Sequence, residues 1–195
     1  MAEPPHSRDD GARERILESA YGLFSRRAVR DVGIDTVIEH ASVAKATLYR
    51  HFASKDDLVL AVLARRGQIW TRGVLDAGAR SRGATAERRL LALFDVLDDW
   101  FRGAGDESRS FASVLLEMGA DHPLGREAIV QLEYVRETVR RLADEAELRN
   151  PSEFARSCQV LINGSIVAAA SGDMHAARRA RRLAQLLIDR DRGRL

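Results

Sequence analysis

The segment from Val43 to Lys55, VAKATLYRHFASK, contains side chains that are suited to binding phosphate groups. Lys45 and Lys55 are the only lysines of the chain, and no acidic residue lies between them. Cationic side chains neutralise phosphates, and hydroxyl, phenol and imidazole groups donate hydrogen bonds to phosphate oxygens. Such residue types fit a nucleic-acid contact and also the solvated face of an ordinary helix, so both interpretations stay open at this point. The donors between the two lysines are Thr47, Tyr49, Arg50 and His51.

Helical spacing divides this segment into a buried side and an outward side. In a short helix over residues 44–52 with Leu48 at its buried centre, Ala44 and Phe52 fall on the same face. Ala46 and Arg50 then point outward. A residue as small as Ala46 would let the backbone lie deep in the major groove of DNA.

Two more helices are predicted before this one. Residues 12–27 have a single apolar stripe, and residues 35–40 form a short helix that is followed by a break at Ser42 and Val43. A longer helix followed by two short helices is typical of a helix-turn-helix. We therefore predict a disordered N-terminal tail over residues 1–10 and a helix-turn-helix over residues 11–56, which is a DNA-binding domain if the first of the two interpretations holds. The candidate DNA-binding residues are Lys45, Ala46, Thr47, Tyr49, Arg50, His51 and Lys55.

The elements that must position this segment are also helical. Strand signals are nearly absent, so the fold class is predicted as all-α with about nine helices. Ser54 is a good N-cap for a connecting helix that reaches about residue 80, and Asn150 with Pro151 marks another helix start. Beyond the connecting helix, a larger helical bundle is expected, and residues 57–195 are assigned to it. Its helices are predicted around residues 90–101, 110–118, 128–146, 151–171 and 174–190.

The composition is that of a globular protein with room for a local basic patch. The chain is 45% hydrophobic with a net charge of +2, which excludes a polybasic nucleic-acid coat. The single cysteine, Cys158, excludes an internal disulfide and favours a reducing compartment. No signal peptide is recognised, and the most apolar run, residues 158–170, is too short to cross a bilayer. We predict a cytoplasmic protein with no membrane partner.

Motifs for catalysis and metal binding are missing from the sequence. The five histidines have no metal-ligand spacing, and no glycine-rich phosphate loop or nucleophile elbow occurs. We therefore expect no enzyme activity, no metal and no cofactor.

From Arg15 to Val62 the sequence resembles the DNA-binding domain of the TetR/AcrR family of transcriptional regulators. The resemblance rests on VIEHASVAKATLYRHFASKDDL over residues 37–58 and on a first-helix pattern. It implies that Thr47, Tyr49, His51 and Lys55 contact the phosphate backbone, and that Lys45, Ala46 and Arg50 lie near bases or neighbouring phosphates. The first-helix pattern consists of Ile16, Leu17, Ala20, Leu23 and Phe24.

The chain departs from the family pattern at several positions around the recognition helix. Gly33 stands where the family usually has Thr or Ser, and Ala44 stands where it usually has Ser. Both changes remove a hydroxyl that could reach a phosphate. Ala28, Ser42 and Ala46 replace glycines that the family usually has. These departures leave the operator sequence open.

The resemblance also implies that the second half of the chain senses a ligand and forms a homodimer. The nearly bare helix from Leu161 to Ala170 supports a dimer, because an apolar surface of that kind is normally covered. The predicted dimer residues are Leu161, Gly164, Val167, Ala168, Leu183 and Leu187. The predicted effector pocket contains Trp70, Phe94, Trp100, Phe101, Phe111, Leu115, Met118, His122, Tyr134 and Asn163.

The function predicted from these features is a repressor that binds a two-fold symmetric double-stranded DNA operator as a homodimer. A small hydrophobic or aromatic effector would release it. The alternative is a DNA-binding protein without a small-molecule switch, acting as an architectural or protein-regulated factor.

Overall fold

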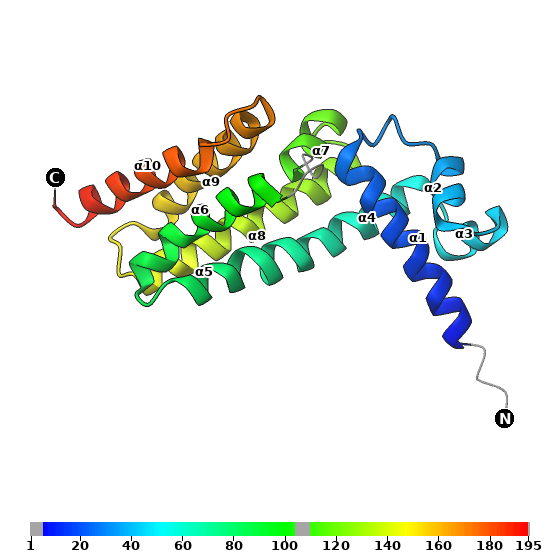
Figure 1. Ribbon diagram of the computed structural model, residues 1–195, viewed down its shortest axis with the longest axis horizontal. Helices are drawn as coiled ribbons and strands as arrows, with labels where there is room; N and C mark the ends of the chain where they lie inside the picture. The colour runs from blue at the N-terminus through cyan, green and yellow to red at the C-terminus, as the bar shows by residue number, and fades with distance from the viewer. Residues whose placement is uncertain (1–5, 104–109, 195) are drawn as a thin grey trace. The chain divides into compact units, whose positions relative to one another are not determined.

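The computed structural model describes residues 6–103 and 110–194, and all regular elements in these two ranges are helices (Figure 1). The all-α prediction is confirmed. Of residues 6–10 only the backbone is described. The chain divides into two compact units, Met1–Arg66 with Arg109–Ile129, and Gly67–Ser108 with Val130–Leu195.

The first unit is a three-helix domain with two later segments packed on it. The domain consists of α1 (His6–Arg26), α2 (Ile34–Ala41) and α3 (Lys45–His51), and α1 packs against both short helices. Helix α4 (Lys55–Arg66) also packs on α1, and α7 (Phe111–Met118) and the beginning of α8 (Pro123–Glu145) complete the unit. The side chains that form the core of the three-helix domain and α4 come from every helix. They include Ile16, Ala20, Val37, Leu48 and Leu58, which are fully buried.

Two boundaries differ from the sequence-based prediction. Helix α1 begins at His6, so residues 6–10 are helical, whereas a disordered tail was predicted for residues 1–10; residues 1–5 lie outside the described part. The predicted domain boundary at residue 56 also differs, because α4 buries Leu58 and Val62 in the first unit.

The second unit is a helical bundle. It contains a π-helix, η1 (Gly67–Asp76), followed by α5 (Ala77–Arg82), α6 (Ala86–Gly103), α9 (Pro151–Ala170), α10 (Ala176–Asp191) and most of α8. Helix α6 packs against α5, α9 and α10, and it buries one continuous row of apolar side chains. The largest of these are Leu90, Leu93, Phe94 and Leu97.

The predicted helix start signals are confirmed, but the connecting helix is not uniform. The backbone N–H of Asp57 donates to the Ser54 hydroxyl at 3.1 Å, which caps α4. Asn150 stands at the N-cap of α9 with Pro151 at the first helical turn, although the Asn150 side chain makes no capping hydrogen bond. The predicted helix over residues 54–80 is present as α4, η1 and α5 in succession. Its π-helical part was not predicted, because residue spacing does not report an i to i+5 hydrogen-bond pattern.

Candidate nucleic-acid interface

Helix α3 separates its side chains into a buried set and an exposed set. Leu48 is fully buried and Phe52, directly after the helix, is 4% exposed, as the spacing predicted. Ala46 and Arg50 are exposed, and Tyr49 is 44% exposed. The exposed side of α3 therefore offers a cation, a phenol and a methyl group on a rigid element that its buried side fixes to α1.

Ala44 does not pack on the buried face with Leu48 as the spacing predicted. It is the N-cap residue of α3, with extended backbone angles (φ −71°, ψ 148°), and its side chain is exposed. The backbone N–H groups of Thr47 and Leu48 donate to the Ala44 carbonyl at 2.9 and 3.2 Å. Alanine has no side-chain oxygen to accept a further N–H, so the α3 N-terminus keeps backbone donors that a phosphate could use.

The turn between α2 and α3 is made by Ser42. Its φ of 51° lies in the left-handed region, which explains why the TetR/AcrR pattern usually has glycine there. The Ser42 N–H donates to the Glu39 carbonyl at 3.1 Å and the Val43 N–H donates to the Ile38 carbonyl at 3.3 Å. These two bonds close the end of α2 and set the direction in which α3 leaves.

Lys45 is engaged by an acidic residue of α2. Its Nζ lies 3.3 Å from Asp35 Oδ1, and the side chains of Lys45 and Asp35 are 62% and 81% exposed. An exposed ion pair of this kind contributes little stability and exchanges readily with another anion. Lys45 thus remains available to a phosphate, but Asp35 places a negative charge beside any phosphate that it would bind.

The other predicted DNA-binding residues lie at the two ends of the same surface. Thr47 and His51 are half-buried on α3, and Lys55 is half-buried in the first turn of α4. The acidic residues Asp56 and Asp57 follow Lys55 directly, where the helix dipole stabilises them. The structure brings Lys45, Thr47, Tyr49, Arg50, His51 and Lys55 onto two consecutive short elements.

Sequence reasoning missed one residue of this surface, Arg13. Its guanidinium carbon lies 5.3 Å from the centroid of the Phe52 ring, so α1 adds a cation beside the end of α3. Arg13 is exposed. Spacing within residues 43–55 could not reveal it, because Arg13 reaches this position only through the packing of α1 on α3.

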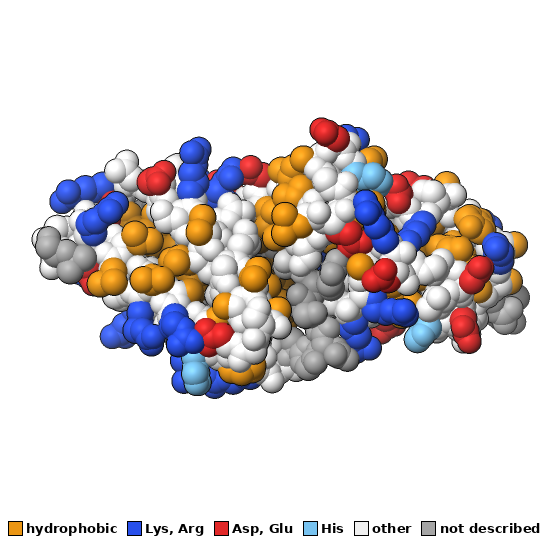
Figure 2. Space-filling view, turned by 90° about the horizontal axis from the view of Figure 1, so that it is seen from above, with side chains coloured by type: hydrophobic (Ala, Val, Ile, Leu, Met, Phe, Trp, Pro, Cys, Tyr) orange, Lys and Arg blue, Asp and Glu red, His pale blue; other side chains and the backbone are white. Residues whose placement is uncertain are grey.

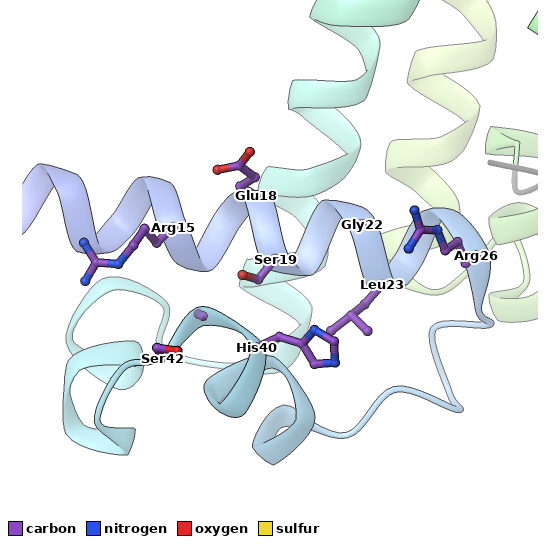
Figure 3. Close-up of a pocket in the computed structure, with 9 residues that line it drawn as sticks. Arg15, Glu18, Ser19, Gly22, Leu23, Arg26, His40 and Ser42 are labelled. Atoms are coloured by element: carbon purple, nitrogen blue, oxygen red, sulfur yellow. The ribbon is translucent and has the colours of Figure 1, made fainter. Parts of the chain in front are cut away.

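A groove lies between α1 and the end of α2 (Figure 3). It has a volume of about 410 Å³ and is open to solvent. Residues of α1 form one side, and the end of α2 with Ser42 forms the other. The lining combines basic and acidic groups with small residues, so the groove has no single charge. The lining residues are Arg15, Glu18, Ser19, Gly22, Leu23, Arg26, His40, Ala41 and Ser42.

Basic residues of the second unit are largely paired with acids. On α10, Arg178 Nε donates to Asp98 at 3.1 Å, Arg181 lies 3.1 Å from Asp95, and Arg179 contacts Asp173. On the face drawn in Figure 2, basic and acidic side chains are interspersed in the same way. These arginines form the solvated, ion-paired face of a helix.

The predicted effector-pocket residues are divided between the two units. The two tryptophan rings, Trp70 and Trp100, are 5.6 Å apart at their centroids, and Phe101 is 5.5 Å from Trp100. Phe94 is buried in the core of the same unit, and Asn163 is half-buried on α9.

Tyr134, also in the second unit, is 49% exposed and lies beside Arg72, so it does not line a buried cavity. Four predicted pocket residues, Phe111, Leu115, Met118 and His122, belong to the first unit. Phe111 is buried there, with Arg66 over its ring at 5.9 Å. This grouping was not predicted from the sequence, because α7 lies between helices of the second unit in the chain order.

The predicted dimer residues lie on α9 and α10 with unequal exposure. Val167 is 64% exposed and Leu183 is 49% exposed, and Gly164 is also exposed. Leu161, Ala168 and Leu187 are half-buried, and Leu161 and Leu187 pack against the core. Two exposed apolar residues, Val160 at 72% and Leu186 at 51%, were missed. Their positions follow helical spacing with Val167 and Leu183 respectively.

The described residues contain neither a membrane-spanning helix nor a cluster of metal ligands. No helix in residues 6–103 and 110–194 is long and apolar enough to cross a membrane. No group of three or more His, Cys, Asp or Glu side chains in these ranges could hold a metal ion.

The fold and the surface together define a class of protein: a helix-turn-helix domain joined to a helical bundle. The family model described as "Bacterial regulatory proteins, tetR family" matches residues 16–62. A TetR-family transcriptional regulator from Streptomyces coelicolor has a similar structure, with a TM-score of 0.80 and 26% identity, and the match covers 92% of this chain and 95% of that one. Residues 16–62 are thus a TetR-family DNA-binding domain, and the chain as a whole resembles TetR-family transcriptional regulators in fold.

Relatives of known type agree with this assignment. The HTH-type transcriptional activator FasR of Mycolicibacterium smegmatis is 35% identical over 94 residues, which are 46% of this chain and 42% of FasR. The chain thus matches less than half the length of that relative. The HTH-type transcriptional regulator SrpR of Pseudomonas putida is 25% identical over 155 residues, covering 76% of this chain and 68% of SrpR. The reduced form of E. coli NemR shares the fold at a TM-score of 0.77 and 18% identity, over 91% of this chain and 97% of NemR.

Proposed function

We propose that this protein binds a two-fold symmetric DNA operator as a homodimer and represses transcription until a small effector releases it. The observation that carries the proposal is the exposed side of α3, where Ala46, Tyr49 and Arg50 face solvent while Leu48 is fully buried. A short helix held in this way can enter a major groove with its outward side chains toward the bases.

The homodimer is supported by the apolar side chains exposed on α9 and α10. Val160 and Val167 lie on one side of α9, and Leu183 and Leu186 are exposed on α10. These two helices also pack against each other. A second copy that covers this surface would remove it from water, and two copies related by a two-fold axis would present two recognition helices to a two-fold symmetric site.

A hydrophobic or aromatic effector is supported by the tryptophan pair in the second unit. Trp70 and Trp100 stand edge to face, and Phe101 adjoins them. The indole N–H of Trp70 and the hydroxyl of Thr71 are buried without a hydrogen-bond partner. Buried polar groups normally have partners, so a ligand that accepts these hydrogen bonds would gain affinity. An effector that favours the state with low DNA affinity would act as an inducer.

The central experiment is selection of bound duplexes from a random DNA pool. A two-fold symmetric consensus bound with a strong salt dependence is expected. Recovery of unrelated sequences with equal affinity would contradict a specific operator. Deletion of the gene in cells that carry a reporter behind the selected site then shows the direction of regulation. A rise in reporter expression indicates a repressor, and a fall indicates an activator.

The small-molecule switch is tested separately by a thermal-shift screen of hydrophobic and aromatic compounds. A compound that stabilises the protein in a saturable way and also releases the selected duplex supports the effector. If no compound does both, the protein is better described as a DNA-binding factor without a small-molecule switch.

A further inference from the structure

A carboxylate of α7 holds the turn between α1 and α2. Glu117 Oε2 accepts a hydrogen bond from the Val29 N–H at 3.2 Å, and Oε1 accepts one from the Arg30 N–H at 2.8 Å. The turn itself is closed by the Asp31 N–H, which donates to the Ala28 carbonyl at 3.0 Å. One carboxylate thus binds two successive backbone N–H groups, and charge-assisted bonds of this kind are stronger than neutral ones.

This turn leads directly into the first of the two short helices. Gly33, the N-cap of α2, has extended backbone angles and no side-chain capping bond. Val29 and Val32 are buried on either side of the turn. Because Gly33 provides no side-chain cap, what holds the preceding turn adds to the packing of α2 on α1 in setting the position of the α2 N-terminus.

A second contact from the same region reaches α4. His122, in the turn between α7 and α8, accepts the Leu124 N–H at Nδ1 with a distance of 3.2 Å. Its Nε2 then faces Asp56 Oδ2 at 3.7 Å. Asp56 is next to Lys55 in the first turn of α4. The end of α7 and the turn after it therefore contact two segments of the DNA-binding domain, the α1–α2 turn and the start of α4.

The geometry of the α7–α8 turn is tightly specified. Gly119 has a φ of 83°, which favours glycine, and it ends α7 two residues after Glu117. A side chain at Gly125 would place its Cβ only 1.8 Å from the Gly119 carbonyl oxygen. The two glycines bring the start of α8 against the end of α7, so Glu117 and His122 are held at a fixed separation.

We propose that Glu117 is a positioning residue for operator binding, because its carboxylate fixes the α1–α2 turn and thereby the α2 N-terminus. The contact between His122 and Asp56 holds the start of α4 in the same way, but more weakly. This inference rests on the proposed function, since it concerns the affinity for an operator. Operator affinity would then depend on Glu117, a residue that is far from residues 43–55 in the sequence and touches neither base nor phosphate.

The test compares Glu117→Gln with Asp121→Asn in the full chain. Asp121 is an exposed acid four residues further on, in the α7–α8 turn, so its variant removes the same charge without touching the α1–α2 turn. Amide hydrogen exchange is measured without DNA, and affinity is measured against the strongest duplex from the random selection. Glu117→Gln is expected to raise exchange at the Val29 and Arg30 amides about tenfold and to weaken binding about five- to tenfold, as for loss of one charge-assisted hydrogen bond.

Two further readouts separate positioning from other roles. The salt slope is expected to stay unchanged in Glu117→Gln, because no phosphate contact is lost. Exchange at Ile16 and Ala20 in the α1 core should also match the wild type. A general rise of exchange through the unit would overturn the inference in favour of plain destabilisation.

Three other results would also overturn the positioning role of Glu117. Unchanged exchange at Val29 and Arg30 would mean that the clamp, the two hydrogen bonds from these amides to Glu117, does not form in solution. A Glu117→Gln affinity equal to that of Asp121→Asn would mean that the clamp does not position the operator-binding elements. If the wild-type protein binds no duplex, the proposed function fails and the positioning role fails with it, while the exchange data still report whether the clamp exists.

Discussion

At the scale of single residues, Lys55 is the cation that most directly tests phosphate binding. It lies in the first turn of α4, next to the amide groups that the Ser54 cap leaves at the helix N-terminus. Lys55→Ala is expected to weaken binding to all duplexes similarly and to reduce the salt slope by about 1, because one phosphate contact is lost. Filter binding at several salt concentrations measures both. Arg88→Ala, an exposed cation of the second unit, is the control, and an equal effect of both variants would remove Lys55 from the interface.

Asp35 is expected to oppose DNA binding. Its carboxylate lies 3.3 Å from Lys45 Nζ, so it competes with phosphate for that cation and repels the DNA backbone. Asp35→Asn should therefore increase operator affinity about two- to fivefold, the range of an exposed ion pair. Glu39→Gln removes the same charge from another exposed site of α2 and serves as the matched control in the same titration. A loss of affinity in Asp35→Asn would show that the pair orients Lys45 instead.

At the scale of helices and turns, the junction of α7 and α8 depends on glycine at position 125. A Cβ there would overlap the Gly119 carbonyl oxygen, so Gly125→Ala must displace the α8 start. We expect a loss of about 1–3 kcal/mol in the free energy of unfolding, measured by urea denaturation. Gly22→Ala is the control, because a Cβ at this α1 position meets nothing within 4 Å and should stabilise the helix by about 0.5–1 kcal/mol. Equal behaviour of the two variants would contradict the close approach.

The bundle contains an ion-pair network whose stability contribution depends on pH. Arg80 donates a hydrogen bond to Glu145 at 2.7 Å, which, together with the charges of Arg80, Arg141 and Arg89, lowers the pKa of the Glu145 carboxyl. A lowered pKa in the folded state stabilises the fold above the ordinary glutamate pKa of about 4.3, and this contribution disappears as the pH falls through the lowered value.

The corresponding prediction compares wild type with Glu145→Gln. The wild type should be more stable at neutral pH, and the difference should shrink as the pH falls below about 4. Thermal unfolding from pH 3 to pH 7 measures it. A difference that stays constant over this range would indicate that the network is not coupled to ionisation of Glu145.

At the scale of the whole molecule, the exposed apolar surface of α9 and α10 is expected to hold the dimer together. Val160→Asp combined with Leu183→Asp places two charges on this surface and should give a monomer in sedimentation velocity, because a buried unpaired charge is costly. Affinity for the two-fold site should fall with it. Leu116→Asp is the control: Leu116 is 84% exposed on α7, so its replacement should leave the assembly unchanged. A dimer that survives the double substitution would locate the interface elsewhere.

The local sequence determined where helices begin and which side of α3 is buried. Ser54, Asn150 and Pro151 mark helix starts by chemistry that acts within one turn, and the position of Leu48 follows from a period of 3.6 residues. The same local pattern was sufficient for the TetR-family resemblance, because the recognition segment is contiguous in the chain.

Only the tertiary structure decided which distant residues join these elements. Arg13 reaches the Phe52 ring, Asp35 reaches Lys45 and Glu117 reaches the α1–α2 turn through helix packing, and no periodicity encodes such contacts. The same limitation explains why the grouping of Phe111, Leu115, Met118 and His122 with the first unit was not predicted. Residue types and spacing specify what a segment can contact, whereas the buried surfaces of α1, α4 and α7 decide what it does contact.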